Sequence, residues 1–231
     1  MWARLRRARE YVEAAVEAPS TVTTRAASSL ARDVVLVATD PETGKVWDDI
    51  APMVSAALFV ELVHEGRLAV TGEGRKVRVT VSDRAPLGDE VLDDVLLSVG
   101  TGVFGQRVRT LMSFTPTGRE VIGQLVAAGS LVEERQRLLG VVPVRRYRVS
   151  PAAGRDALVA RVRGVLLHGS VPDERTALLV CVLDLAMPLK RVVGKAGAKE
   201  ADRRAKQLRA GLGAEEQAVL SAVTAAMQSA S

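Results

Sequence analysis

Residues 155–228 consist of four helix-patterned segments that follow one another with short breaks containing Gly or Pro. The second segment, residues 173–193, is apolar on nearly every side, whereas the third, residues 199–213, is strongly polar. These patterns predict a central helix and an outer helix, respectively. Aromatic residues form only 3% of the sequence, so Val, Leu and Ala must build most of the core. This composition favours packed helices with a few strands, and we predict a mainly α-helical fold.

The first half of the chain mixes helix and strand patterns. Residues 33–40, DVVLVATD, form a short buried-type run, which is a strand signal, and end at the turn-rich DPETGK. Residues 51–66 repeat apolar side chains at intervals of three and four, and Gly66 is placed as a helix C-cap. Residues 67–83 alternate apolar and polar side chains around GEG, which predicts a β-hairpin. Residues 86–99 predict another amphipathic helix.

A weak internal repeat relates two parts of the chain. LVHEGRLAV (residues 62–70) and LVAAGSLVE (residues 125–133) share Leu-Val, a following Gly and a second Leu at the same spacing. The second copy is therefore predicted to form a helix over residues 119–129 and then a β-hairpin over residues 130–149, with Gly140 at or near its tip.

The chain is expected to hold a single globular helical domain with β-hairpins over residues 32–231, preceded by a basic extension and linker over residues 1–31. The start of the sequence lacks the apolar core of a secretory signal. The longest apolar stretch, residues 177–189, is interrupted by Asp184 and is too short to span a bilayer. The lone Cys181 indicates a reducing compartment. We expect a cytoplasmic protein with at most reversible, peripheral contact with membranes.

Catalytic and metal-binding patterns are weak. GTGVFG at residues 100–105 has the glycine spacing of a dinucleotide site, but the preceding residues predict a helix instead of the required strand. GKAGAK at residues 194–199 lacks the Ser or Thr of a phosphate-binding loop and predicts a helix break. Neither His64 nor His168 has a Cys, His or carboxylate at metal-ligand spacing. We expect a non-enzymatic protein with no catalytic residues, no metal and no cofactor.

The second hairpin carries the most informative pattern, RLLGVVPVRRYR at residues 137–148, in which an apolar run is flanked by arginines. The net charge of +5 draws the chain toward polyanions or anionic membranes. In a membrane-binding hypothesis the apolar residues insert and the arginines stay at headgroup level, each contributing about 1 kcal/mol near an anionic surface. The inserting residues are Leu138, Leu139, Val141 and Val142, and the basic rim is Arg135, Arg137, Arg145 and Arg146.

Three other interpretations of this hairpin stay open. The hairpin could be buried against the helices, since alternating apolar strands are often part of a core. It could mediate contact between copies of the chain, as exposed apolar patches do. It could also be the wing of a winged-helix nucleic-acid-binding protein, with Arg145, Arg146 and Arg148 on phosphates. The apolar tip, and the lack of a base-reading helix directly before the hairpin, argue against this nucleic-acid alternative.

The ordered set VATDPETGKVWDD, ALFVELVHEGRL, PLGDEVLDDVL, LVAAGSLVEE and the hairpin resembles the Golgi phosphoprotein 3 family from about Asp33 to the last helix. The resemblance implies a mostly helical domain that binds phosphatidylinositol 4-phosphate at a basic pocket and dips an apolar hairpin into the bilayer. Eukaryotic members also bind glycosyltransferase tails and a vesicle coat. We interpret this chain as a bacterial member, for which no Golgi coat partner is expected.

The resemblance also assigns a lipid headgroup pocket. Trp47 matches the family's pocket tryptophan, either at the headgroup interface or packed in the core. Positions that carry arginines in the family fall on Ser55, Thr115 and Gly118, with Arg119 one residue away. Because arginine holds phosphate by charge-assisted hydrogen bonds, this pocket is expected to discriminate poorly. The expected ligand is an anionic membrane lipid, with a phosphoinositide as the more specific candidate.

Overall fold

A computed structural model of the protein describes residues 29–100, 106–108, 118–138 and 141–228. The described chain is mainly helical with two small antiparallel sheets, which confirms the predicted fold class. The helices are α2 (Leu30–Ala38), α3 (Ile50–His64), α4 (Glu90–Gly100), α6 (Gly118–Ala127), α7 (Arg155–His168), α8 (Glu174–Ala186), α9 (Lys190–Val193), α10 (Ala198–Ala210) and α11 (Ala214–Gln228). The strands are β1 (Leu68–Thr71), β2 (Arg78–Val81), β3 (Gln106–Arg107), β4 (Leu131–Leu138) and β5 (Val142–Val149).

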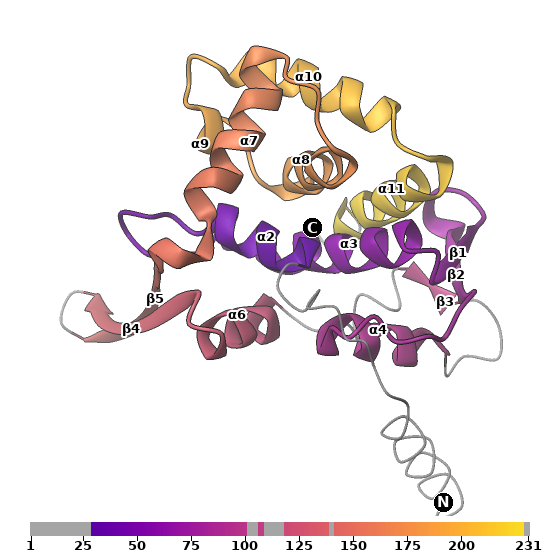
Figure 1. Cartoon of the computed structure of the whole chain (residues 1–231), viewed down its shortest axis with the longest axis horizontal. Helices are drawn as coiled ribbons and strands as arrows, with labels where there is room; N and C mark the ends of the chain where they lie inside the picture. Colours follow the sequence, from indigo (N-terminus) through magenta and orange to yellow (C-terminus); the bar gives the residue numbers. More distant parts are fainter. Residues whose placement is uncertain (1–28, 101–105, 109–117, 139–140, 229–231) are drawn as a thin grey trace, which may run out of the picture.

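The helices form layers around α2, α3 and α8 (Figure 1). Helices α7, α10 and α11 lie on one side of this centre, and α4, α6 and the β4–β5 hairpin lie on the other. Residues 178–183 of α8 are all buried, whereas α10 buries only Ala201 and Ala205. The predicted central and outer helices are therefore confirmed. The predicted segment 173–193 is not one helix, however, because α8 ends at Ala186 and α9 begins after Pro188. Among the described residues, no helix has the length and apolarity needed to cross a bilayer.

The strand pattern of residues 33–40 was a wrong indication, because this run lies mostly in helix α2. The Ser29 hydroxyl caps the helix by accepting from the Arg32 amide at 3.4 Å. Helix α2 packs against α3, α6, α7 and α8, so almost every residue in it is buried. A helix buried on all sides shows no polar stripe in its sequence, and a short one then looks like a buried strand.

The first predicted hairpin is confirmed, with Leu68 of β1 opposite Val81 of β2. The structure adds the two-residue strand β3, which pairs with the other edge of β2. Helix α4 also forms as predicted and ends at Gly100. A helix instead of a strand therefore precedes the glycine-rich stretch. Residues 101–105 of that stretch lie outside the described chain. The first four residues of GKAGAK separate α9 from α10, which confirms the predicted helix break.

The second predicted hairpin forms an eight-residue ladder from Leu131 opposite Val149 to Leu138 opposite Val142. Gly140, its predicted tip, lies outside the described residues. Strand β4 packs against α6 near the base. The far end of the hairpin extends beyond the helices (Figure 1).

Candidate functional site

The β4–β5 hairpin is held at its base by the turn that follows α2. Within this turn, the Asp40 carboxylate accepts from the amides of Glu42 at 3.0 Å and Thr43 at 2.8 Å. The Gly44 carbonyl then accepts from the Tyr147 amide of β5 at 2.7 Å. Gly44 has φ +64°, and a Cβ placed on it would lie 3.0 Å from the Tyr147 nitrogen. Glycine is thus required both by the backbone conformation and by the close approach of β5.

The two ends of the hairpin have opposite surroundings. At the base, Leu131 and Tyr147 are buried. At the far end, Val141 is 78% exposed, which is the environment that the membrane hypothesis predicts for an inserting residue. Leu139 lies outside the described residues, as do the side chains of Arg137, Leu138 and Val142. At Val141 the hairpin is therefore not buried against the helices.

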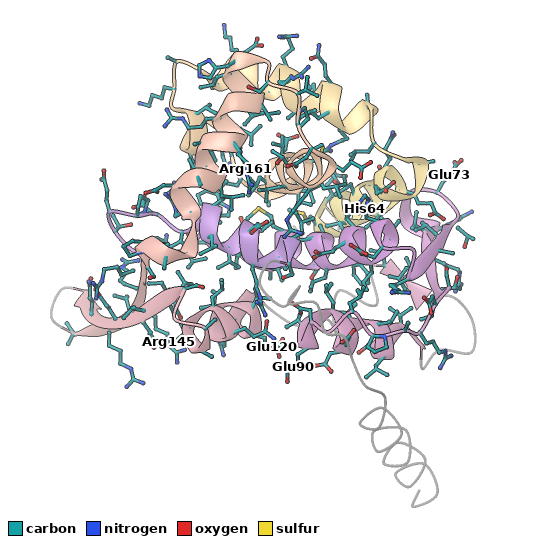
Figure 2. All side chains as sticks on the ribbon, viewed as in Figure 1. His64, Glu73, Glu90, Glu120, Arg145 and Arg161 are labelled. Atoms are coloured by element: carbon teal, nitrogen blue, oxygen red, sulfur yellow. The ribbon has the colours of Figure 1, made fainter. Side chains whose placement is uncertain are left out.

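The arginines of the hairpin lie on both of its faces. Arg135 and Arg145 are directly opposite each other in the ladder, and their guanidinium groups lie 3.9 and 3.6 Å from the same Glu133 carboxylate. The Arg135 side chain is 87% exposed, and Arg145 is exposed on the hairpin as well (Figure 2). On the other face, Arg148 pairs with Glu134 at 2.9 Å. Exposed ion pairs of this kind are weak, so they hold the arginines only loosely.

Arg146, the remaining predicted rim residue, is half-buried. Its Cβ would lie 3.2 Å from a Cβ placed on Gly44, so it lies where the turn meets β5. Arg146 therefore lies beside the anchoring turn, and the Arg135–Arg145 pair is one step farther along the ladder toward the tip.

Trp47 packs between the turn and the C-terminal helices. Its indole N–H donates to the Ala186 carbonyl at 2.9 Å, and the Arg191 guanidinium lies 4.8 Å from the ring centroid. The ring is half-buried against the core. The polar edge of the indole is therefore satisfied within the protein, which favours the packed alternative over the headgroup interface.

Two of the other predicted headgroup residues are buried. Ser55 is 4% exposed within α3. Gly118 is buried at the start of α6, where a Cβ would approach Ile50 to 2.6 Å. Arg119 is exposed beside it, and Thr115 lies outside the described residues. In this arrangement neither Ser55 nor Gly118 lies on the surface.

Nucleophilic and charged side chains of the core serve the fold. Burial raises the pKa of Cys181 to about 12, so its thiol stays protonated at neutral pH. Arg175 of α8 bridges Asp33 at 2.8 Å and Glu61 at 3.3 Å, and thereby joins α2, α3 and α8. Within the described ranges, no three His, Cys, Asp or Glu side chains come together as a metal site.

Sequence reasoning predicted the turn at DPETGK but missed its contact with Tyr147. The Asp-x-x-Thr-Gly spacing indicates a tight turn. Nothing in that spacing shows that β5, a hundred residues later, docks on it.

Comparison with known proteins identifies the family. The family model described as Golgi phosphoprotein 3 (GPP34) matches residues 30–230, which is nearly all of the described chain. A search of curated proteins gives no match. The predicted boundary between residues 31 and 32 stays a prediction, although helix α2 begins at Leu30. The family expected from the order of segments is confirmed, and the chain belongs to the Golgi phosphoprotein 3 family.

Proposed function

We propose that this protein is a non-enzymatic, cytoplasmic protein that docks reversibly on anionic membranes through the β4–β5 hairpin. The observation that carries the proposal is a hairpin clamped at its base, with Val141 exposed at its far end and exposed arginines along its strands. Membership of the Golgi phosphoprotein 3 family supports it. A phosphorylated lipid headgroup is the more specific candidate ligand. No Golgi coat partner is proposed.

Apolar insertion and charge are both needed in this proposal. Burying one valine side chain contributes about 1.5–3 kcal/mol. Each arginine near an anionic surface adds about 1 kcal/mol. Either contribution alone gives marginal binding, whereas together they give reversible docking. Rigid anchoring at Gly44 supports the proposal further, because it reduces the ordering cost of binding.

The test compares two exposed valines. Val141 lies at the hairpin tip, and Val171, 92% exposed, lies in the loop between α7 and α8. Co-sedimentation with liposomes containing phosphatidylglycerol should weaken roughly tenfold or more in Val141→Asp, because the buried apolar area is lost and an anion is added. Val171→Asp, which adds the same charge elsewhere, should bind like the parent protein. Parent-like binding by a folded Val141→Asp variant would refute the proposal.

Two further measurements identify the alternatives. If the hairpin acts on nucleic acid, the protein will bind duplex DNA in a salt-sensitive way and lose this binding when Arg145 and Arg146 are replaced by alanine. If the tip joins copies of the chain, sedimentation velocity will show an oligomer that Val141→Asp dissociates. Either result, combined with no liposome binding, would replace the membrane proposal.

A further inference from the structure

The outer side of α4 carries an exposed leucine together with two carboxylates. Leu97 is 64% exposed, and no other large hydrophobic side chain of a described helix is exposed. Glu90 and Asp94 are exposed as well, and positions 90, 94 and 97 lie on one face of the helix. Figure 2 shows Glu90 on the side of α4 away from α3. The opposite face packs into the core through Val91, Leu92, Val95, Leu96 and Val99. Helix α4 thus has an outward face that the described residues leave uncovered.

The charge of this face is not neutralised by the described chain. Glu90 and Asp94 make no side-chain hydrogen bond or ion pair with any residue that the structure describes. Asp93, beside them, accepts from backbone amides at the start of the helix. The helix dipole favours Glu90 in the first turn, but it gives no reason for Asp94 or for Leu97. A basic amphipathic helix has the complementary pattern, with apolar side chains beside Arg or Lys.

The described chain begins beside this face. Its first residue, Ser29, is buried. Arg32, in the first turn of α2, lies 3.5 Å from the Asp89 carboxylate just before α4. The same guanidinium donates to Gln124 of α6 at 3.3 Å. Residues 1–28 are therefore attached to the fold next to α4.

Residues 2–17, which we call the arm, have the sequence pattern of a basic amphipathic helix. Their apolar side chains recur at helical spacing, at Trp2, Leu5, Val12 and Val16. The first nine residues of the chain contain four arginines and no acidic residue. A helical arm would be about 24 Å long, compared with about 16 Å for α4. Residues 18–28 span up to about 36 Å when extended, which is enough to lay the arm along α4.

We propose that the outer face of α4 is a docking surface for the arm of the same chain. The apolar side chains of the arm cover Leu97, and its arginines approach Glu90 and Asp94. An amphipathic helix that lays its apolar face on another surface is a common mode of recognition. The tether holds the arm at a roughly millimolar effective concentration, which a separate basic peptide or a second copy does not reach in dilute solution. A small contact of this kind therefore favours the arm of the same chain as the occupant.

Paramagnetic broadening in nuclear magnetic resonance tests the docking in the full chain. Ala8→Cys replaces a small side chain of the arm and takes a nitroxide label. Cys181 stays unlabelled, because burial raises its pKa to about 12 and keeps the thiol protonated. In isotope-labelled protein, the amide signals of residues 90–97 should lose intensity, whereas that of Val171, in the loop between α7 and α8, should not. Undiminished signals from α4 would overturn the proposal.

A mixed sample separates docking within one chain from docking between copies. Protein that carries the nitroxide but no isotope label is mixed with isotope-labelled protein that lacks the nitroxide. If the arm docks on its own chain, the α4 signals of this mixture should keep their intensity. Losses equal to those of the singly prepared protein would mean that the arm docks on a second copy, and would overturn the assignment of the occupant.

Charge-matched variants separate a specific surface from general attraction. Glu90→Lys combined with Asp94→Lys should weaken docking roughly tenfold or more, because two attractive charge pairs become repulsive. Glu42→Lys combined with Glu73→Lys makes the same change of net charge at exposed positions outside α4, and Glu73 lies well away from α4 in Figure 2. This control should keep the broadening of the α4 signals. Equal losses of docking in the two variants would mean nonspecific electrostatics and overturn the proposal.

The apolar part of the contact is tested at Leu97. Leu97→Asp should weaken docking roughly tenfold or more, because apolar contact is lost and an anion is buried under the arm. The exposure of Leu97 means that this variant keeps its fold. Val171→Asp adds the same charge elsewhere and should leave the arm docked. Unchanged broadening in Leu97→Asp would overturn the proposed surface. Val141→Asp should also leave the arm docked, so failure of membrane docking and failure of arm docking give different results.

Discussion

The two copies of the helix-then-hairpin repeat begin alike and end differently. After α3, the Gly66 amide donates to Val63 at 2.9 Å and the Arg67 amide to Leu62 at 2.8 Å. After α6, Gly129 and Ser130 donate to the corresponding residues at 3.0 and 2.9 Å. The two glycines have φ values of +68° and +70°. The weak sequence repeat thus encodes the same helix-ending turn twice, with a buried leucine two residues after each glycine.

Beyond these turns, strand length and coverage separate the two hairpins. The first has strands of four residues, gains β3 at one edge and packs against α11, whose Glu215 accepts from the Val70 amide at 3.1 Å. The second has strands of eight residues and forms a sheet of two strands. A hairpin of two strands has little independent stability, so its anchored base must hold it. In one copy the hairpin is packed into the fold, and we call it the scaffold. In the other copy the hairpin projects from the fold, and we call it the appendage.

The largest expected effect tests whether the first hairpin is scaffold. Val79 of β2 is fully buried, and Val79→Asp would place an unpaired charge in the core. We expect it to lower the free energy of unfolding by more than about 4 kcal/mol. Val141→Asp at the tip of the second hairpin should change it by less than about 0.5 kcal/mol. Urea denaturation followed by circular dichroism measures both, and similar losses would end the distinction between scaffold and appendage.

Sequence reasoning found the elements whose periodicity is visible and missed those fixed by distant contacts. Helices with a polar face and both hairpins were predicted because their patterns of period 3.6 and 2 survive partial exposure. Helix α2 was missed because its Val34 to Ala38 segment is buried all round. Strand β3, with two residues, is too short to show a period.

The candidate sites divide in the same way. The hairpin arginines are neighbours in sequence, so their pattern could be read directly. Helix α4 was predicted from its period, but only the contact between Arg32 and Asp89 shows that the described chain begins beside it. In the pocket that the resemblance assigned, Ser55 and Gly118 are buried. Burial of single positions depends on the packing of neighbouring helices, which their sequence spacing did not reveal.

An intermediate effect tests how the appendage is held. In Gly44→Ala the new Cβ meets the Tyr147 backbone and also occupies a left-handed conformation. We expect a local cost of about 2–3 kcal/mol, seen as faster hydrogen exchange of the Tyr147 amide. Gly129→Ala has the same backbone strain at φ +70° but open space around the new Cβ, and should leave Tyr147 protected. Equal exchange in the two variants would mean that the turn does not clamp β5.

The smallest expected effect comes from giving the first copy the residue that the second copy has at the same position. Glu61 precedes Leu62-Val63 in the first copy, and Gln124 precedes Leu125-Val126 in the second. Both side chains contact α2, because Glu61 accepts from the Leu30 amide at 2.8 Å and Gln124 accepts from the Arg32 guanidinium at 3.3 Å. Glu61→Gln keeps an acceptor for Leu30 and leaves Asp33 to pair with Arg175. We therefore expect a change in stability of only about 1 kcal/mol at pH 7.

The pH dependence of the stability difference between the parent protein and Glu61→Gln is the more informative measurement. Burial raises the pKa of Glu61, and this outweighs the opposing influence of the Leu30 amide and Arg175. A carboxyl group whose pKa is higher in the folded state contributes stability at low pH, and this contribution is lost as the pH rises through the folded pKa. The free energy of unfolding of the parent protein, relative to Glu61→Gln, should therefore fall as the pH rises from acid toward neutral. A rise over the same range would mean that Arg175 governs Glu61 more strongly than burial does, and that the first copy holds α2 by charge whereas the second holds it by an amide.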